Sequence, residues 1–407
     1  MIKFLFLYAE SFRNAYKDIK IASKGNEKII IFVQSRRGRY EQIYGMGKIK
    51  LLGKTPEELK EIALACGLPK FAGSQIAQWL YGKKVRTIDE MTNLSKAGRE
   101  RLAESYETGA VAYSDRRVSS DGTEKYLFPV TCSYGENLFG IEGGTPGRVE
   151  SSSVEAVMIP ELDRRTLCVS SQAGCKMGCK FCMTGRQGFH GNLSAADILS
   201  QYVSVDEADS LTGTVFMGMG EPLDNYENVK RAIDVLTADW GFGWSPKRIT
   251  LSSIGVLPNL KRFLDETRCH LAISLHDAFP EERAELMPVH KRYHISDVVD
   301  LIRRYDFSGQ RRVSFEYTMF AGLNDDKRHA DAIVRLLGGL ECRVNLIRFH
   351  RIPDFPYESS ADGVMEVFRD RLCRAGITST IRASRGEDIY AACGMLAGKH
   401  GSSQNGL

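Results

Sequence analysis

The feature that most constrains the fold is a strand-then-helix pattern that repeats through the C-terminal part of the chain. Short apolar runs rich in β-branched residues alternate there with segments of helical length. The expected strands span 166–170, 214–217, 248–251, 271–275, 313–319, 344–349 and 379–382. Such alternation predicts an α/β fold with a parallel sheet and right-handed crossovers. About six units predict a partial (β/α)6 barrel, open at one side, with its chemistry at the carboxyl ends of the strands.

Three cysteines stand close together soon after the first expected strand. Cys175, Cys179 and Cys182 have the spacing CxxxCxxC, and Phe181 directly precedes the last of them. A ferredoxin-type [4Fe–4S] cluster takes four thiolates, so three leave one iron open to a chelating ligand. Zinc sites usually pair cysteines as C-x₂-C with a second pair further on. The spacing resembles the signature of the radical SAM superfamily, which cleaves S-adenosylmethionine (SAM); a ferredoxin with a distant fourth cysteine is the alternative.

Glycine and polar residues follow the next three expected strands. Gly218-Met-Gly220-Glu221-Pro222 comes after strand 214–217, where glycines allow a ligand to approach the backbone. Its glutamate can accept hydrogen bonds from an α-ammonium group, and the segment resembles the GGEP motif of radical SAM enzymes. Taken alone, each segment is also consistent with an ordinary turn. The residues expected to contact SAM here are Gly220, Glu221, Ser252, Ser274, Leu275 and His276.

The chain before the barrel has three parts of different character. Residues 1–45 are basic and weakly patterned, and Met46 has the features of a natural start, so we interpret 1–45 as a non-native N-terminal extension. A basic arm for nucleic acid is the alternative. Residues 46–106 show helical spacing and predict a helical accessory domain whose lysines either face solvent or contact RNA phosphates. Residues 107–160 predict a small β linker region with short strands at 111–113, 125–128, 137–140 and 155–159. Residues 161–407 are expected to form the barrel.

Composition narrows the class of protein. The chain has 407 residues, of which 43% are apolar, and no stretch approaches the ~20 apolar residues of a membrane span. Its net charge of +4 permits an anionic partner without demonstrating one. Ten cysteines without a clear secretion signal indicate thiols kept reduced in the cytosol. We therefore expect a cytoplasmic enzyme with no membrane partner, acting as a monomer.

The whole pattern resembles the RlmN/Cfr family of radical SAM RNA methyltransferases, from about residue 46 to 399. Three passages carry the resemblance: 167–175 (LCVSSQAGC), 274–276 (SLH) and 385–398 (RGEDIYAACGMLAG). The resemblance implies a [4Fe–4S] cluster on the three cysteines and two SAM molecules per turnover. It also implies 23S rRNA and tRNA as substrates and a flavodoxin- or ferredoxin-type electron donor. We favour the RlmN branch, which methylates C2 of adenosine, over the Cfr branch, which methylates C8.

The resemblance also assigns catalytic roles. C2 of adenine is an electron-poor carbon without a lone pair, so direct transfer from a methyl sulfonium is unavailable and a radical route is needed. In the family, a cysteine matching Cys393 is first methylated and its methyl group is then activated. The residue matching Cys168 forms a transient disulfide with Cys393 that releases the product, and Glu155 matches the proton acceptor. His350 stands where many relatives have a SAM-contacting asparagine, and histidine can still donate a hydrogen bond there.

Simpler interpretations remain beside these roles. Cys168 lies in an apolar strand, where a buried cysteine usually acts as a small hydrophobic residue. Cys393 lies in a run of small residues that helix packing could also favour. A non-catalytic iron–sulfur RNA-binding protein would need the cluster but not Cys393. A glycyl-radical activase would share the cluster motif and give no reason for the two additional cysteines.

Overall fold

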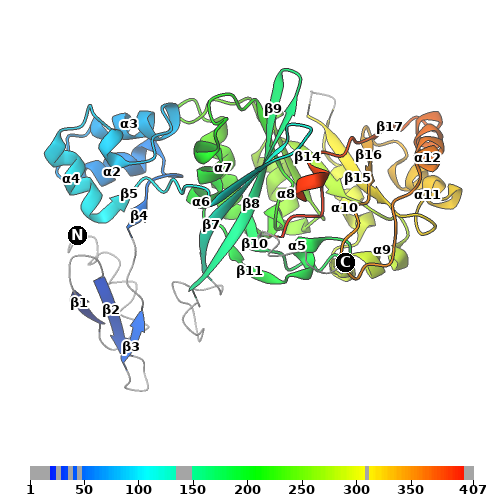
Figure 1. Cartoon of the computed structure of the whole chain (residues 1–407), viewed down its shortest axis with the longest axis horizontal. Helices are drawn as coiled ribbons and strands as arrows, with labels where there is room; N and C mark the ends of the chain where they lie inside the picture. Colours follow the sequence, from blue (N-terminus) through cyan, green and yellow to red (C-terminus); the bar gives the residue numbers. More distant parts are fainter. Residues whose placement is uncertain are drawn as a thin grey trace. The chain divides into compact units, whose positions relative to one another are not determined.

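The computed structural model describes residues 19–23, 29–34, 40–43, 48–133, 149–307 and 311–397. The chain divides into two compact units (Figure 1). The first comprises Met1–Ala110 and Ser133–Val149, and the second comprises Val111–Cys132 and Glu150–Leu407. Each unit is described by itself.

The first unit contains a small antiparallel sheet and a group of short helices. The sheet is formed by β1 (Ile19–Ser23), β2 (Ile29–Gln34) and β3 (Tyr40–Ile43). The remaining elements are β4 (Ile49–Lys50), α2 (Pro56–Ala65), α3 (Ala72–Ala77), η1 (Gln78–Gly82), η2 (Ile88–Glu90), α4 (Lys96–Ser105) and β5 (Tyr106–Glu107). Thr55 caps α2 as its sequence predicts: its hydroxyl accepts from the Glu58 N–H, and the Glu58 carboxylate accepts from the Thr55 N–H.

The second unit is built on one mixed sheet of 12 strands. Its order is β10-β11-β7-β8-β9-β12-β13-β14-β15-β16-β17, and β6 pairs with β7. From β9 to β17 every pair is parallel, whereas β8 runs antiparallel to β9. Among the described residues the order does not return to its first strand, so the sheet is open, as expected for a partial barrel.

Strand β9 and strands β12 to β17 agree with the expected bounds to within a few residues, whereas β7 and β8 are longer than expected and β6, β10 and β11 were not predicted. The strands are β6 (Asp115–Val118), β7 (Glu124–Ser133), β8 (Val149–Glu161), β9 (Arg164–Cys168), β10 (Gln172–Gly174), β11 (Phe189–Asn192), β12 (Gly213–Phe216), β13 (Ile249–Ser253), β14 (His270–Ser274), β15 (Val313–Met319), β16 (Arg343–Arg348) and β17 (Thr378–Ile381). The strand expected at 111–113 is absent, because Val111 and Tyr113 instead bond to Ser200 and Asp206. The strand expected at 137–140 lies outside the described residues.

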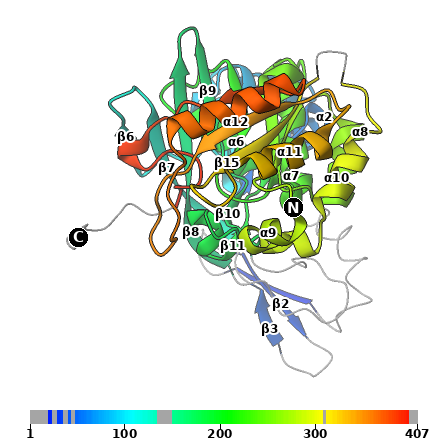
Figure 2. The same ribbon diagram turned by 90° about the vertical axis from the view of Figure 1, so that its right-hand side faces the viewer.

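Helices connect the parallel strands and cover the sheet (Figure 2). They are α5 (Met183–Arg186), α6 (Ala195–Ser204), η3 (Pro222–Asn225), α7 (Tyr226–Thr237), η4 (Pro246–Arg248), α8 (Leu257–Glu266), α9 (Pro280–Leu286), η5 (Pro288–Lys291), α10 (Ile295–Ile302), α11 (Lys327–Leu337), α12 (Asp362–Arg374) and η6 (Glu387–Ile389). In α10, Ile295, Val298, Val299 and Ile302 are buried, which is the spacing of one helix face. No described helix is long and apolar enough to cross a membrane.

Candidate active site

The three motif cysteines lie in the loop between β10 and β11, residues 175–188, which is called the cysteine loop below. The Cys175 N–H donates to the Gly188 carbonyl at 2.8 Å, and the Cys182 N–H donates to the Cys179 carbonyl at 3.2 Å. Gly174 begins the loop with φ of +71°, and a Cβ atom there would lie 2.0 Å from the Gly188 oxygen. Only glycine therefore allows this turn, which brings the loop back onto its own hairpin.

The three half-buried cysteines share one environment that fits a cluster. Burial raises the pKa of Cys175 to about 12, and the neighbouring Cys182 adds to that shift. Burial also raises the pKa of Cys179 well above its usual range, and Cys182 and Cys175 add to it. Thiolates gathered in this way need a compensating positive charge, which coordinated metal ions supply. The donor set of three thiolates matches a [4Fe–4S] cluster that keeps one iron open.

Arg283 of α9 is a site residue that sequence reasoning missed. It is fully buried, and its guanidinium donates to the carbonyls of Leu275 and Ser274, both at 2.9 Å. Its Nη1 also lies 2.8 Å from His290 Nδ1, and its charge lowers the pKa of Cys179. Arg283 therefore joins α9 to the end of β14, and the Lys180 N–H of the cysteine loop donates to the Leu286 carbonyl of α9 at 3.0 Å.

Glu221 is a buried carboxyl group beside the cysteine loop. Its Oε1 accepts from the Leu223 N–H and its Oε2 from the Ile254 N–H, both at 3.0 Å. Burial raises its pKa to about 7, and no described lysine or arginine forms an ion pair with it. A bound ammonium group would supply the missing positive charge. Gly220 precedes it with φ of +99°, and a Cβ atom there would lie 2.5 Å from the Gln172 side chain.

The ends of β13 and β14 supply the other expected SAM contacts. Ser252 and Ser274 are half-buried, whereas Leu275 and His276 are buried. His276 Nδ1 accepts from the Thr318 N–H at 3.0 Å, so the ring hydrogen is on Nε2. Its ring meets that of Phe181 edge-on, with centroids 4.8 Å apart. Burial lowers the pKa of His276 to about 3, which keeps it a neutral donor.

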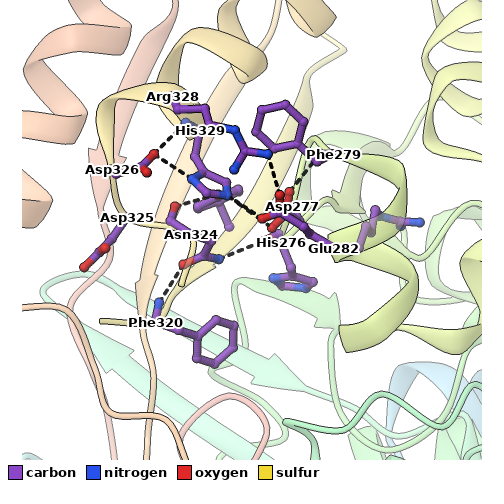
Figure 3. A network of polar contacts seen from close by, with 12 residues as sticks. His276, Asp277, Phe279, Glu282, Phe320, Asn324, Asp325, Asp326, Arg328 and His329 are labelled. Carbon is purple, nitrogen blue, oxygen red and sulfur yellow. Dashed lines mark hydrogen bonds and ion pairs between the residues drawn. The ribbon is translucent and has the colours of Figure 1, made fainter. Parts of the chain in front are cut away.

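The backbone around His276 is held in an unusual conformation. His276 has φ of +54°, in the left-handed region that few residues with a side chain adopt. Asn324 fixes this turn, because its Nδ2 donates to the His276 and Thr318 carbonyls at 2.8 Å (Figure 3). Its Oδ1 accepts from the Phe320 N–H at 2.7 Å. The histidine is thus positioned by residues from the next strand and its loop.

Cys168 and Cys393 come from distant parts of the chain and meet at this site. Cys168 ends β9 and is buried, whereas Cys393 is exposed. Burial raises the pKa of Cys168 to about 12, and the charge of Cys393 adds to the shift. The pKa of Cys393 is raised by the protein atoms that crowd its sulfur, then by Glu316 and by Cys182. Cys393 therefore acts electrostatically on Cys168, and Cys182 of the cysteine loop acts on Cys393.

Residues 386–397, called the Cys393 loop below, are joined by hydrogen bonds directly to the cysteine loop. The Met183 N–H, next to Cys182, donates to the Gly394 carbonyl at 2.8 Å. The Thr184 hydroxyl donates to the Leu396 carbonyl at 2.7 Å. The position of Cys393 is therefore set by the first turn after the motif cysteines.

Glu155 of β8 is fully buried and faces the Cys393 loop. Its Oε2 accepts from the Ala397 N–H at 2.7 Å, and its Oε1 lies 3.0 Å from Lys125 Nζ of β7. Lys125 also donates to the Tyr390 carbonyl at 3.2 Å. The Lys125–Glu155 pair therefore contacts the loop on both sides of Cys393. Sequence reasoning found Glu155 but missed Lys125.

The turn between β6 and β7 is hydrogen-bonded to the beginning of the Cys393 loop. The Ser119 hydroxyl and the Ser120 N–H donate to the Asp388 carboxylate at 2.5 and 3.1 Å. In return, Asp121 accepts from the Gly386 N–H at 3.1 Å. His350, expected at the SAM site, is buried with its Nδ1 3.3 Å from Glu387 Oε1, so it also contacts this loop.

Comparisons with known proteins match this geometry. The radical SAM superfamily matches residues 169–333, and the ribosomal RNA large subunit methyltransferase N-terminal domain matches residues 49–108. The chain is 57% identical over 350 residues to the probable dual-specificity RNA methyltransferase RlmN of Porphyromonas gingivalis, covering 86% of this chain and 94% of that protein. It is 37% identical over 358 residues to the dual-specificity RNA methyltransferase RlmN of Syntrophus aciditrophicus, covering 87% of this chain and 98% of that protein.

A solved structure is similar along most of the chain. The crystal structure of a radical SAM methyltransferase from Sphaerobacter thermophilus matches with a TM-score of 0.78 and 35% sequence identity. The match covers 86% of this chain and 100% of that one.

Proposed function

Because the chain belongs to the RlmN family of radical SAM RNA methyltransferases, we propose that it methylates C2 of an adenosine in 23S rRNA and in tRNA, with Cys393 as the methyl carrier. Family membership confirms the enzyme class predicted from the cysteine spacing, together with SAM and a [4Fe–4S] cluster as cofactors. The observation that supports the assignment of Cys393 is the pair of hydrogen bonds from Met183 and Thr184 to Gly394 and Leu396, which join the segment around Cys393 to the cysteine loop.

The residues present fit both cofactors. Cys175, Cys179 and Cys182 would hold the cluster, and the buried Glu221 carboxylate would bind the SAM ammonium group. The remaining SAM contacts in the proposal are Gly220, Ser252, Ser274, Leu275, His276 and His350. When bound, the cluster and SAM supply the radical chemistry that methylation of an electron-poor aromatic carbon requires.

Cys393 and Glu155 have different roles at the substrate carbon: Cys393 carries the methyl group, and Glu155 accepts a proton. Cys393 is an exposed residue, although protein atoms crowd its sulfur. The adenine must therefore leave its stack and enter the site to reach a methyl group on that sulfur. Radical addition of the methyl carbon to C2 leaves one unpaired electron, so the C2 hydrogen must leave as a proton together with one electron, which the bound cluster would accept. The Glu155 carboxylate accepts that proton, and Lys125 and the Ala397 N–H hold it toward the loop.

Cys168 releases the product. Its sulfur attacks the Cys393 sulfur, so a disulfide forms while the bond between the Cys393 sulfur and the product carbon breaks. The electron pair of that bond passes to the product carbon, which then takes a proton and becomes the methyl group. The raised pKa of Cys168 means that its thiol must lose a proton during this step.

The other parts of the chain have proposed roles that follow the family. We assign residues 46–106 to RNA binding, supported by the match of an RNA methyltransferase N-terminal domain to residues 49–108. We assign residues 161–407 to the catalytic barrel and residues 107–160 to the β linker, which contributes β6, β7 and β8 to the same sheet. A flavodoxin- or ferredoxin-type protein delivers electrons to a cytoplasmic monomer.

Nucleoside mass spectrometry tests the regiochemistry. The cluster-loaded protein is incubated with SAM, a reductant and unmodified 23S rRNA or tRNA, and the digested nucleosides are compared with 2-methyladenosine and 8-methyladenosine standards. We expect 2-methyladenosine from both RNAs. Formation of 8-methyladenosine would instead assign Cfr-type chemistry, and cluster-bound protein that leaves both RNAs unmodified would support the non-catalytic binding protein.

A further inference from the structure

A second group of metal-ligand side chains lies beyond the turn that follows β14, outside the proposed methyl-transfer machinery (Figure 3). Asp277 comes directly after His276, Glu282 lies in α9, and His329 lies in α11. One ligand atom from each lies within 4.8 Å of the other two. His329 Nε2 is 2.9 Å from Glu282 Oε2 and 3.8 Å from Asp277 Oδ2.

The orientation of His329 is fixed by Asp326, the residue that caps α11. Asp326 Oδ1 accepts from the His329 N–H at 2.9 Å and lies 2.7 Å from its ring Nδ1. Because the carboxylate can only accept, Nδ1 carries the hydrogen. Nε2 in turn shares a hydrogen with Glu282 Oε2 at 2.9 Å. A cation bound between Nε2 and the two carboxylates takes the place of that hydrogen, which leaves for solvent. Histidines that bind metal ions commonly have this arrangement, with a carboxylate on the nitrogen away from the metal.

Asp277 provides an independent observation that points to a ligand. Its side chain is fully buried, and its Oδ1 accepts from the Phe279 N–H at 2.8 Å. Its Oδ2 accepts no hydrogen bond from any described residue. A buried carboxylate oxygen without a partner is costly. A hydrogen on His329 Nε2 would point to Glu282 at 2.9 Å and leave Asp277 Oδ2 at 3.8 Å unsatisfied.

The charges favour a divalent cation. Asp277, Glu282 and Asp326 contribute three negative charges around His329, and Arg328 contributes one positive charge through its ion pair with Glu282 at 2.5 Å. When a cation displaces the Nε2 hydrogen, the histidine is neutral and a charge of −2 remains, which one divalent cation neutralises. We propose that Asp277, Glu282 and His329 bind a divalent cation of the manganese or zinc class.

The donor set and its position define what this cation does. One imidazole and two carboxylates suit manganese or zinc better than soft ions that prefer thiolates. Glu282 is 31% exposed, so the ion can enter from solvent on its side. By joining α9 and α11 to the residue after His276, the cation holds the strained turn that carries a proposed SAM contact. The site uses none of the thiols and does not depend on methyl transfer.

Binding of Mn²⁺ alone tests the site. Cluster-loaded wild-type protein, with the cluster in its EPR-silent oxidised state, is titrated with Mn²⁺, and the free ion is measured by EPR. Thiolates are poor ligands for Mn²⁺, so the cysteine loop does not compete. We expect about one Mn²⁺ bound per chain, with affinity reduced at least about tenfold in Asp277→Asn and His329→Gln. Asp297→Asn, a change of an exposed carboxylate on α10, should bind like wild type.

Two results would overturn the proposal. One is a wild-type titration in which the free Mn²⁺ signal does not fall, and the other is equal binding by wild type and Asp277→Asn. Either result would leave His329 as a protonated imidazole between carboxylates. If the Asp277 or His329 variants do not fold, Glu282→Gln serves in their place, because its side chain is partly exposed. Its binding must then fall at least about tenfold.

Discussion

At the scale of single residues, the site depends on charged side chains that are buried although the local sequence suggests exposure. Arg283 lies in the run Pro280-Glu-Glu-Arg-Ala-Glu285, which is typical of a solvent-exposed helix. In the structure it is fully buried and donates to the carbonyls of Ser274 and Leu275. Its partners are eight and nine residues away, so no periodic pattern could reveal them. Glu221, by contrast, could be predicted because its neighbours in the sequence form the motif.

Replacing Arg283 with methionine should destabilise the protein and weaken the cysteine loop. Two buried carbonyls would lose their donor, which costs about 1–3 kcal/mol for each unsatisfied group. We expect the unfolding temperature of the cluster-loaded protein to fall by at least about 5 °C and its iron content to decrease. Arg304→Met, at an exposed position of the same residue type, is the control. Unchanged stability and iron content would show that Arg283 does not hold this region together.

His276 should make stability depend on pH. Burial lowers its folded-state pKa to about 3, whereas the unfolded chain takes up the proton near about 6.5. The neutral buried ring therefore stabilises the fold fully above pH ~6.5, and this contribution is lost as the pH falls toward 3. Unfolding temperatures of wild type and His276→Gln, measured at pH ~7.5 and ~5.5, should show a larger drop for wild type. Equal drops would contradict this assignment.

At the scale of elements, the Cys393 loop is held at two places far from it in sequence. The β6–β7 turn binds Asp388 and Gly386, and the Lys125–Glu155 pair binds Tyr390 and Ala397. Ser119 and Asp388 are 269 residues apart. Sequence spacing predicted the helices, the strands and the cysteine loop, which depend on neighbouring residues. Sequence spacing could not predict these contacts of the Cys393 loop, because they depend on the order of the strands in the whole sheet.

Removing the hydrogen bonds between the β6–β7 turn and the Cys393 loop should slow methyl transfer without removing the cluster. Asp388→Ala removes the acceptor of Ser119 and Ser120. Misplacing a reacting group by about an ångström can cost up to ~100-fold in rate, and we expect RNA methylation to slow at least about tenfold. Initial rates and iron content are compared with those of Asp370→Ala, an exposed aspartate on α12. A wild-type rate in Asp388→Ala would mean that the turn does not position Cys393.

At the scale of the whole sheet, strand order explains why the site forms where it does. The hairpin β10–β11, which flanks the cysteine loop, pairs with β7, and β8 and β9 follow with Glu155 and Cys168. Three groups of the proposed chemistry therefore lie in the same part of one sheet, with only β7 between the β10–β11 hairpin and β8. The fourth, Cys393, follows β17 at the opposite edge, and its loop returns to contact β7 and β8. The sequence predicted the parallel strands, but the position of β10 and β11 depends on pairing that local patterns do not specify.

Methyl transfer through Cys393 is tested most directly by peptide mass spectrometry of the Cys168→Ala variant. The variant is expressed with iron and sulfide, purified with its cluster, and incubated with SAM, a reductant and RNA. Cys269→Ala, which removes a buried cysteine outside the site, is the control. We predict a methyl group on Cys393 in untreated protein and a covalent RNA adduct on Cys393 that accumulates only in Cys168→Ala. An unmodified Cys393 without an adduct, in protein that retains its cluster, would contradict its role as the methyl carrier.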